Sequence, residues 1–598
     1  MDHQNANLAT TYRELYRAKF RDDVRAGTKT PFLFPLHLIG VWFIPTLYLA
    51  IPHRNRPWLY HARWLVLAFV VVFNFNMILN VSSTDFGAGY GAGLIGAWGI
   101  VWNFTLLVWT RPQWEARRVN VRKIRNQEKP NTDLKDYKPL TNNQNGDYTK
   151  EDYRENSKTT GSELNGYTNN DHGPLHNLKE RRTNFETANL PKERTSTLEA
   201  PSSPRENGNS VHSLTEQEFE YYWQEYPEDA SFWSRIDWAF DIVSTFRMTG
   251  WNWAISSIPP YEPPPRVGDH QLPLSSVGPQ RTEQGYTRHL TRRELFLDRF
   301  LYHVLPNYLI ADFCAVSMTL DPYFILGPEY AALLPLPPHL TSLTPTVLFL
   351  LRTLLSFTGT LCALDLLFNA GQLALVFLPP LPQILRFRAH PWHIPSVTGS
   401  FAQVLDRGLA GFWGAWWHQT FRFGFSAPTQ YLLRHSFIHP HTLTAKLVAA
   451  FFAFLTSGFL HASGSYSAMP AHTRWYLPPL FFLLAGVGTM LQSHLSKLLS
   501  KYISKQPRWV RRAGNMAFVT VWMVGTSWLL VDDFGRCGLW LFEPVPVSVF
   551  RALGWGPAGD RRVWRIDERY APRWNTESRT MRGMASRIET GKKNGFDD

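Results

Sequence analysis

Long apolar runs separated by polar segments constrain the fold of this chain more than any other feature. A helix needs about 20 mainly apolar residues to cross a bilayer. Eight runs approach or exceed that length, at residues 31–51, 64–79, 87–109, 300–320, 346–378, 444–466, 475–491 and 514–530. The third run contains Gly91, Gly93, Gly96 and Gly99, which favour close helix packing. We therefore predict an all-α, polytopic membrane bundle of about eight transmembrane helices.

A long polar segment interrupts these runs and divides the chain into regions. Residues 111–215 are rich in Asn, Asp, Glu, Lys, Thr and Pro and show almost no apolar periodicity, so they cannot bury enough surface to fold. We predict a disordered cytosolic insert there. The other predicted regions are an N-terminal region with three spans (1–110), an interfacial and proline-rich connector (216–297), a helical core (298–535) and a C-terminal tail (536–598).

The distribution of lysine and arginine predicts the side of the membrane on which each loop lies, because short cytosolic loops carry an excess of both. Most basic clusters fall on one side along an eight-span path, whereas Arg13 and Arg551, near the two ends, would be lumenal. The run at 346–378 is predicted to be one tilted helix, since a hairpin would put Arg386 and Arg388 on the wrong side. The net charge of +13 reflects membrane-flanking loops, and no nucleic-acid motif accompanies it.

The start of the chain is polar and charged, so no cleavable signal peptide is predicted. The first apolar run, 31–51, would then act as a retained signal anchor. The three cysteines are dispersed and give neither a disulfide framework nor the spacing of a zinc site.

The segment FWGAWWHQ at 412–419 combines several tryptophans with a histidine. In a continuous helix, Trp413 and Trp417 lie one turn apart on one face, and His418 and Arg422 lie one turn apart on a neighbouring face. This arrangement predicts an aromatic surface with a polar edge.

A second histidine, His461, ends the apolar run that begins near residue 444. Ser457 and Gly458 come one turn before it, so small residues leave space beside the imidazole. Ionisable groups at membrane depth are by default functional candidates. We therefore treat His461 and His418 as the two candidate catalytic residues.

The two motifs resemble those of the wax-synthase branch of the membrane-bound O-acyltransferases. In that family an Asn or His of the first motif and an intramembrane His of the second form the active site, and the matching residues are His418 and His461. The resemblance is clearest over residues 297–533, and FRMTGWNW at 246–253 resembles a segment of fungal members. Two family positions that are commonly basic are Ala415 and Trp416 here.

The resemblance implies an acyl-CoA-dependent O-acyltransferase in the endoplasmic-reticulum membrane, with its acyltransferase core at 298–535. Esterification needs a base for the hydroxyl proton and a donor for the oxyanion. We expect His461 to be the base, because burial keeps an imidazole neutral, and His418 to be the donor. The candidate substrate-binding residues are Trp413, Trp417, Gln419, Arg422 and Ser457. No metal and no cofactor besides the acyl-CoA co-substrate is expected.

The acceptor is expected to be a hydroxylated lipophilic molecule taken from the bilayer. Fungal relatives with this domain often acetylate terpenoid or polyketide secondary metabolites, and the Asn-rich insert fits a filamentous-fungal protein. By this analogy we favour acetyl transfer over wax-ester synthesis from long-chain alcohols.

Two other classes of function remain as alternatives. His435, His439 and His441 suggest the histidine boxes of a membrane di-iron oxygenase, although Pro440 breaks the helix that would align them and such sites need several boxes. A non-catalytic lipid transporter would explain the spans equally well but would leave the two motif histidines without a role.

Overall fold

The computed structural model describes residues 8–123, 219–261, 278–378, 388–468, 473–557, 560 and 562–565. Within these residues the chain is mostly helical, and its strands form two small two-stranded sheets. The all-α fold class is therefore confirmed. Residues 124–215, most of the predicted disordered insert, lie outside the described residues.

Residues 8–117 contain six α-helices and two of the four described strands. They are α1 (Leu8–Arg25), α2 (Ile44–Ala50), α3 (Pro57–His61), α4 (Arg63–Asn80), α5 (Phe86–Phe104) and α6 (Pro112–Glu115). Strands β1 (Thr30–Pro31) and β2 (Val81–Ser82) pair in parallel.

The remaining helices follow the insert. They are α7 (Phe232–Ser244), α8 (Arg292–Arg299), α9 (Leu305–Met318), α10 (Pro322–Leu326), α11 (Pro338–Thr341), α12 (Pro345–Phe377), α14 (Ala402–Arg407), α15 (Leu409–Gly411), α16 (Arg422–Arg434), α17 (Leu443–Ala468), α18 (Leu477–Leu498), α19 (Ser500–Ile503), α20 (Arg508–Thr526), α21 (Trp528–Arg536) and α22 (Val549–Ala552).

Four helical segments among the described residues are long and apolar enough to cross a membrane: Pro57–Asn80, Phe86–Trp109, Pro345–Phe377 and Leu443–Ala468. The pair α20 and α21, bent by 41°, makes a fifth if it counts as one span. The predicted number of eight spans is thus not confirmed, whereas α12 is a single helix as predicted.

Two of the runs form continuous helices that contain a π-helical turn. In the run at 31–51 the turn η2 (Ile39–Phe43) leads directly into α2, and Leu36–Ala50 is one apolar helix shorter than a full span. In the run at 300–320 the turn η5 (Phe300–Val304) leads directly into α9. Pro45 and Pro306 lie just after these turns, where the missing N–H of a proline removes one α-helical hydrogen bond.

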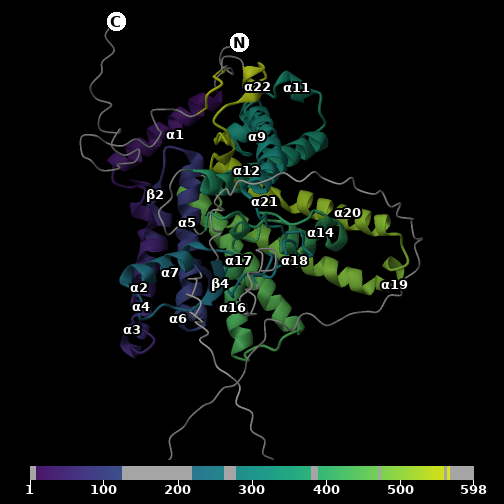
Figure 1. Cartoon of the computed structure of the whole chain (residues 1–598). Helices are drawn as coiled ribbons and strands as arrows, with labels where there is room; N and C mark the ends of the chain where they lie inside the picture. The colour runs from purple at the N-terminus through teal and green to yellow at the C-terminus, as the bar shows by residue number, and fades with distance from the viewer. Residues whose placement is uncertain are drawn as a thin grey trace, which may run out of the picture. The chain divides into compact units, whose positions relative to one another are not determined.

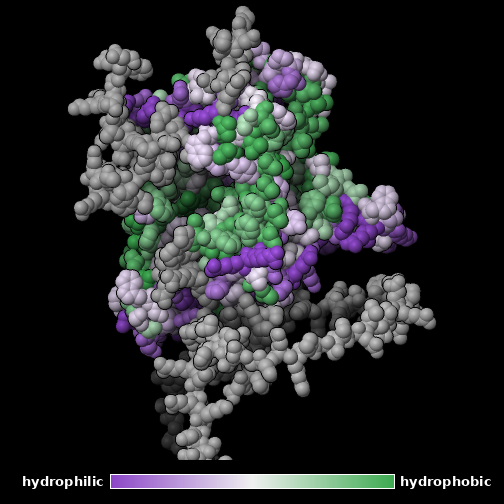
Figure 2. All heavy atoms as spheres, turned by 45° about the horizontal axis from the view of Figure 1, so that its top comes forward, coloured by the Kyte–Doolittle hydropathy of each residue, from purple (hydrophilic) through white to green (hydrophobic). Residues whose placement is uncertain are grey.

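Large apolar side chains project outward from the long helices. Leu65 and Val72 of α4 and Leu354 and Leu367 of α12 are each more than 60% exposed. On the face shown in Figure 2, hydrophobic residues gather over the centre and hydrophilic residues lie mostly toward the edges. Apolar surface of this kind is suited to contact with lipid.

Helices α5 and α17 lie side by side in the middle of the helical part (Figure 1). A Cβ at Gly93 of α5 would lie 2.0 Å from the main-chain oxygen of Ser463 in α17, so only glycine permits this approach. Ser467 of α17 donates to the main-chain oxygen of Ile78 at 2.8 Å, which ties α17 to α4 as well. The close packing predicted from the glycines is confirmed at Gly93, whereas nothing lies within 4 Å of a Cβ at Gly91.

Residues 111–123 are folded, although the insert was predicted to begin at 111. Strand β3 (Arg118–Lys123) pairs antiparallel with β4 (Phe219–Gln224), with Arg118 opposite Gln224. Val119 is buried and packs against Trp392. The partner strand lies beyond the insert, so local composition could not indicate this pairing.

Asp241 of α7 connects β3 to the core. Arg118 and Arg388 donate to its carboxylate at 3.2 and 2.6 Å. Burial alone would raise the pKa of this carboxyl group, but the two guanidinium groups more than offset burial and hold the pKa of Asp241 below its ordinary value. The carboxylate therefore stays ionised and links two segments that are distant in sequence.

The two ends of the chain meet in a buried cluster of ion pairs. Arg13 of α1 contacts Glu543 at 2.6 Å, and Glu543 also pairs with Arg551 and Arg565. Asp560 pairs with Arg565 at 2.9 Å. Glu543 and Asp560 thus pair with part of the basic charge that an eight-span path would place on the lumenal side at both ends. The region predicted as a C-terminal tail is therefore folded as far as Arg565 where it is described.

The glycine contact between α5 and α17 generates a stability prediction. We expect Gly93→Ala to lower the free energy of unfolding by about 1–3 kcal/mol or more, because its Cβ has no room against Ser463. Gly91→Ala, on the same helix with open space around its Cβ, is the matched control and should leave stability nearly unchanged. Thermal unfolding of the detergent-solubilised proteins measures both, and equal midpoints for the two variants would contradict the packing account.

Candidate active site

The imidazole of His461 is held by three aromatic residues from three other helices. Its Nδ1 lies 2.8 Å from the hydroxyl oxygen of Tyr90 in α5. Its ring stacks on Phe482 of α18 with centroids 4.9 Å apart, and Phe534 of α21 lies at 6.2 Å. The side chain remains partly accessible, and Nε2 forms no hydrogen bond with a described residue. Nε2 is therefore the nitrogen that can meet a substrate.

The helical turn that follows His461 is fixed by a buried carboxylate. The Ser465 hydroxyl donates to one oxygen of Asp533 in α21, and the main-chain N–H of Arg474 donates to the other oxygen at 2.8 Å. These bonds hold α17 against α21 beside the histidine.

His418 does not lie in a continuous helix, and the prediction of shared helical faces around it is wrong. The π-helical turn η8 (Phe412–Trp416) ends at Trp417, whose backbone is extended, and α16 begins only at Arg422. The amide nitrogen of Gln419 donates to the main-chain oxygens of Trp413 at 2.9 Å and Trp417 at 2.7 Å. Gln419 thus satisfies carbonyl groups that a helix end leaves without partners, and it places His418 in a tight turn.

Arg422 supports the same turn. Its guanidinium donates to the main-chain oxygen of Gly414 at 2.7 Å and to the side-chain oxygen of Gln419 at 2.9 Å. The contacts of Gln419 and Arg422 give both residues a structural role in the turn that holds His418, and this role does not require a substrate. Their predicted substrate contacts stay predictions, as does that of Ser457, which is partly accessible in α17 one turn before His461.

Aromatic side chains join the two histidines into one region. His418 lies 4.8 Å from the ring of Trp417 and 5.3 Å from Phe368 of α12. Trp413 lies 5.9 Å from Phe482, the ring that stacks on His461. Phe412 contacts both Trp413 and Trp417, so a chain of ring contacts connects the two histidines.

The protonation state of His418 follows from its surroundings. Burial lowers the pKa of its imidazole to about 3, and His461 and Arg247 contribute in the same direction. Its Nδ1 is buried without a hydrogen bond to a described residue, which leaves Nε2 as the accessible nitrogen. Because the pKa lies below the ordinary value of about 6.5, His418 is neutral near pH 7, and its burial destabilises the fold only as the pH falls below about 6.5.

Arg247 belongs to the fungal-type segment at 246–253 and anchors it to the chain before His418. Its guanidinium donates to the main-chain oxygens of Ser396 at 2.6 Å and Pro395 at 3.0 Å. The adjacent Phe246 packs edge-on against Trp98 of α5 at 5.1 Å. This segment therefore links the N-terminal helices to the histidine turn.

Several residues of the site were missed by sequence reasoning, namely Tyr90, Phe368, Phe482 and Asp533. All four come from helices outside the two histidine motifs. For Tyr90 a signal existed, because it has the only polar side chain between residues 86 and 97. Phe368, Phe482 and Asp533 resemble many other apolar or acidic residues in the sequence. Only the packing of α12, α18 and α21 shows that they lie at the site.

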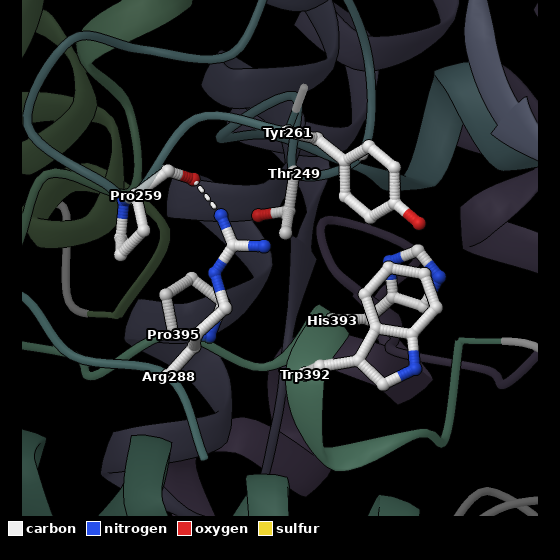
Figure 3. A pocket seen from close by; sticks show the side chains of 8 residues that line it. Thr249, Pro259, Tyr261, Arg288, Trp392, His393 and Pro395 are labelled. Carbon is white, nitrogen blue, oxygen red and sulfur yellow. Dashed lines mark hydrogen bonds between the residues drawn. The ribbon is translucent and has the colours of Figure 1, made fainter. Parts of the chain in front are cut away.

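A separate recess lies near the fungal-type segment (Figure 3). It is lined by Thr249, Gly250, Pro259, Tyr261, Arg288, Trp392, His393 and Pro395. The Arg288 guanidinium donates to the main-chain oxygens of Pro259 and Pro260. The empty space of the recess, about 220 Å³, includes open solvent, so the enclosed part is smaller and we place neither substrate in it.

The histidines of the oxygenase alternative do not come together. His435 follows the end of α16, where its Nδ1 lies 2.9 Å from the main-chain oxygen of Tyr431, and His439 and His441 are exposed in the loop before α17. Within the described parts of the chain, no group of three or more His, Cys, Asp or Glu side chains is arranged to hold a metal ion.

Comparison with known proteins gives a family match around both histidines. Residues 394–484 match the model described as the membrane bound O-acyl transferase family. The chain is 24% identical to acetyltransferase ple2 of Rhodocybe pseudopiperita over 348 residues, which are 57% of this chain and 78% of the relative. No solved structure gives a significant match.

Two relatives from Aspergillus fumigatus match shorter stretches. Acetyltransferase pyr8 is 29% identical over 169 residues, 27% of this chain and 38% of the relative. Acetyltransferase spyB is 35% identical over 85 residues, 14% of each chain. The chain therefore spans less than half the length of these two. Together the matches confirm the resemblance that the histidine motifs indicated, and they support a membrane O-acyltransferase.

The contacts of Gln419 generate a prediction about the histidine turn. Gln419→Glu keeps the size and the acceptor for Arg422 but cannot donate to the carbonyls of Trp413 and Trp417. We expect the rate of acyl transfer to fall at least about tenfold, because leaving buried carbonyls unpaired costs about 1–3 kcal/mol.

The matched control is Gln403→Glu. Gln403 donates to the main-chain oxygen of Glu283 at 3.0 Å, outside the His418 turn, and its substitution should leave the rate near wild type. A Gln419→Glu protein with wild-type activity would show that the amide bonds do not hold the turn.

Proposed function

Because the chain resembles the membrane-bound O-acyltransferases and its relatives are acetyltransferases, we propose that it transfers an acetyl group from acetyl-CoA to a hydroxyl of a lipophilic acceptor. The proposed acceptor class is a terpenoid or polyketide secondary metabolite, and the proposed location is the endoplasmic-reticulum membrane. The observation that carries the proposal is that two motif histidines, each with an accessible Nε2, are connected by a chain of aromatic contacts through η8 and Phe482.

In the proposed reaction, Nε2 of His461 takes the proton from the acceptor hydroxyl as the oxygen attacks the carbonyl carbon of the thioester. The carbonyl oxygen becomes an oxyanion, which the N–H of His418 stabilises. The carbon–sulfur bond then breaks, and the sulfur leaves with the proton held by His461. The products are an acetyl ester and free coenzyme A, so the thioester supplies the driving force.

The different environments of the two histidines support different roles. His461 has a hydrogen-bond partner at Nδ1, which leaves its Nε2 available as the base. His418 is neutral near pH 7 because its pKa is lowered to about 3, so it would act as an oriented donor and not as a second base. Asn, which the family often has at this position, can donate in the same way.

The surroundings of the histidines support a lipophilic acceptor. Phe368 lies 5.3 Å from His418 and Phe482 lies 4.9 Å from His461, and Trp413 contacts both Phe482 and Phe454. Apolar and aromatic walls with a few polar groups are typical of sites that bind small apolar molecules. The same walls would exclude water and so limit hydrolysis of the thioester.

The direct test is esterification by membranes that contain the protein. Labelled acetyl-CoA and palmitoyl-CoA are each supplied with terpenoid, polyketide and long-chain alcohols, and the esters are identified by mass spectrometry. We expect acetyl esters of polycyclic alcohols, formed without added metal or reductant and in the presence of a chelator. Wax esters from palmitoyl-CoA alone would favour wax synthesis, and a product formed only with O₂, reductant and iron would contradict acyl transfer.

Substitution of the two histidines tests their separate roles. His461→Ala should lower turnover by about 10²–10⁴, the usual contribution of a general base, with normal membrane insertion. His418→Asn should retain part of the activity, whereas His418→Leu should lose about 10²–10³ because it cannot donate.

The control is the double variant His439→Ala, His441→Ala, which alters exposed histidines away from the site and should keep wild-type activity. Equal losses in His418→Asn and His418→Leu would contradict the donor role. Turnover by His461→Ala near the wild-type level would remove it as the base.

A further inference from the structure

Tyr90 lies far outside the matched range, yet it contacts the candidate base. Its hydroxyl oxygen is 2.8 Å from Nδ1 of His461 and 3.3 Å from the main-chain oxygen of the same residue. The side chain is buried, with 4% of its surface exposed. One phenol group thus meets two groups of one histidine.

The number of protons available determines which arrangement makes both contacts of Tyr90 hydrogen bonds. A main-chain carbonyl only accepts, and a phenol has one proton to donate. If the Tyr90 hydroxyl donates to the carbonyl of His461, then Nδ1 must carry a proton and donate to the phenol oxygen. If the hydroxyl instead donates to Nδ1, the carbonyl contact is not a hydrogen bond. Only the first arrangement satisfies both contacts.

We propose that Tyr90 is a positioning residue that holds His461 in the tautomer protonated at Nδ1. The lone pair is then on Nε2, the nitrogen that faces accessible space, so the base is ready to accept a hydroxyl proton. The bond from Nδ1 to the phenol oxygen persists when the imidazole becomes charged, and charge-assisted bonds are stronger. The inference rests on the proposed function, since it concerns the residue assigned there as the base.

The packing around Tyr90 keeps the hydroxyl in place. A Cβ at Gly464, one turn after His461, would lie 2.8 Å from the Tyr90 ring, so the ring lies directly over that glycine. Phe534 packs edge-on against Tyr90 with centroids 5.6 Å apart. Phe482 covers a face of the imidazole. The Tyr90 ring is therefore packed between Gly464 of α17 and Phe534 of α21.

The first test removes the hydroxyl alone. Tyr90→Phe should lower kcat about 10-fold to 100-fold and leave the KM for acyl-CoA within about twofold, because the loss affects the base and its charged form and not donor binding. A residue with a merely structural role would not produce this split between kcat and KM.

Tyr16→Phe is a matched control. Tyr16 is also buried, and its hydroxyl donates to the main-chain oxygen of Ala468 at 2.9 Å, on the same helix α17 but away from His461. It should lose a comparable amount of stability while kcat stays near wild type. An equal fall of kcat in the two variants, or no fall in Tyr90→Phe, would overturn the proposal.

A second measurement does not depend on activity. Solid-state ¹⁵N NMR of histidine-labelled wild-type protein, with the His461 signals assigned by their absence in His461→Ala, distinguishes a protonated from an unprotonated ring nitrogen. We expect a protonated Nδ1 and a bare Nε2, and in Tyr90→Phe a shift toward the other tautomer. A proton on Nε2 in the wild-type protein would overturn the proposal.

Failure of the proposed function and failure of the Tyr90 proposal would give different results. Wild-type turnover by His461→Ala would contradict the base assignment in the proposed function, whatever the tautomer is. An inactive His461→Ala protein together with a fully active Tyr90→Phe protein would contradict only the role of Tyr90.

Discussion

The close contact between α5 and α17 determines where both histidines lie. Gly93 brings the two backbones together, and α5 reaches the site on either side of that point. One turn before Gly93, Tyr90 contacts His461. Beyond it, Trp98 packs on Phe421 at 4.6 Å, and Phe421 in turn lies 5.8 Å from His418. A helix from the N-terminal region thus connects two motifs that the sequence separates by some 40 residues.

Several buried polar groups around the two histidines are paired locally or across helices, as a low-dielectric environment favours. Gln419 and Arg422 satisfy the carbonyls of the histidine turn, and Asp533 receives bonds from Ser465 and Arg474. The ion pairs at the chain ends follow the same rule. Nε2 of each motif histidine is accessible and has no hydrogen-bond partner among the described residues, which leaves both nitrogens available for chemistry.

Hydropathy alone predicted the helical class and the single long helix α12, because an uninterrupted apolar run has few other stable structures in a membrane. The number of eight spans is not confirmed, because four helices among the described residues, or five if α20 and α21 count as one span, are long and apolar enough to cross a membrane. The two catalytic candidates were named from their motifs, but the helix assumed around His418 was wrong because a side chain, Gln419, ends it. Strand β3 and the contact of Tyr90 depend on partners far away in sequence, which periodicity does not encode.

The central claim is that His418 and His461 act together on one thioester carbonyl. A cryo-EM structure of the protein with a non-hydrolysable acetyl-CoA analogue, in which a methylene group separates the carbonyl from the sulfur, tests it most directly. The account predicts the carbonyl oxygen within about 3 Å of Nε2 of His418, with Nε2 of His461 facing the carbonyl carbon from the side where an acceptor hydroxyl would enter. An acetyl group bound away from both histidines would contradict it.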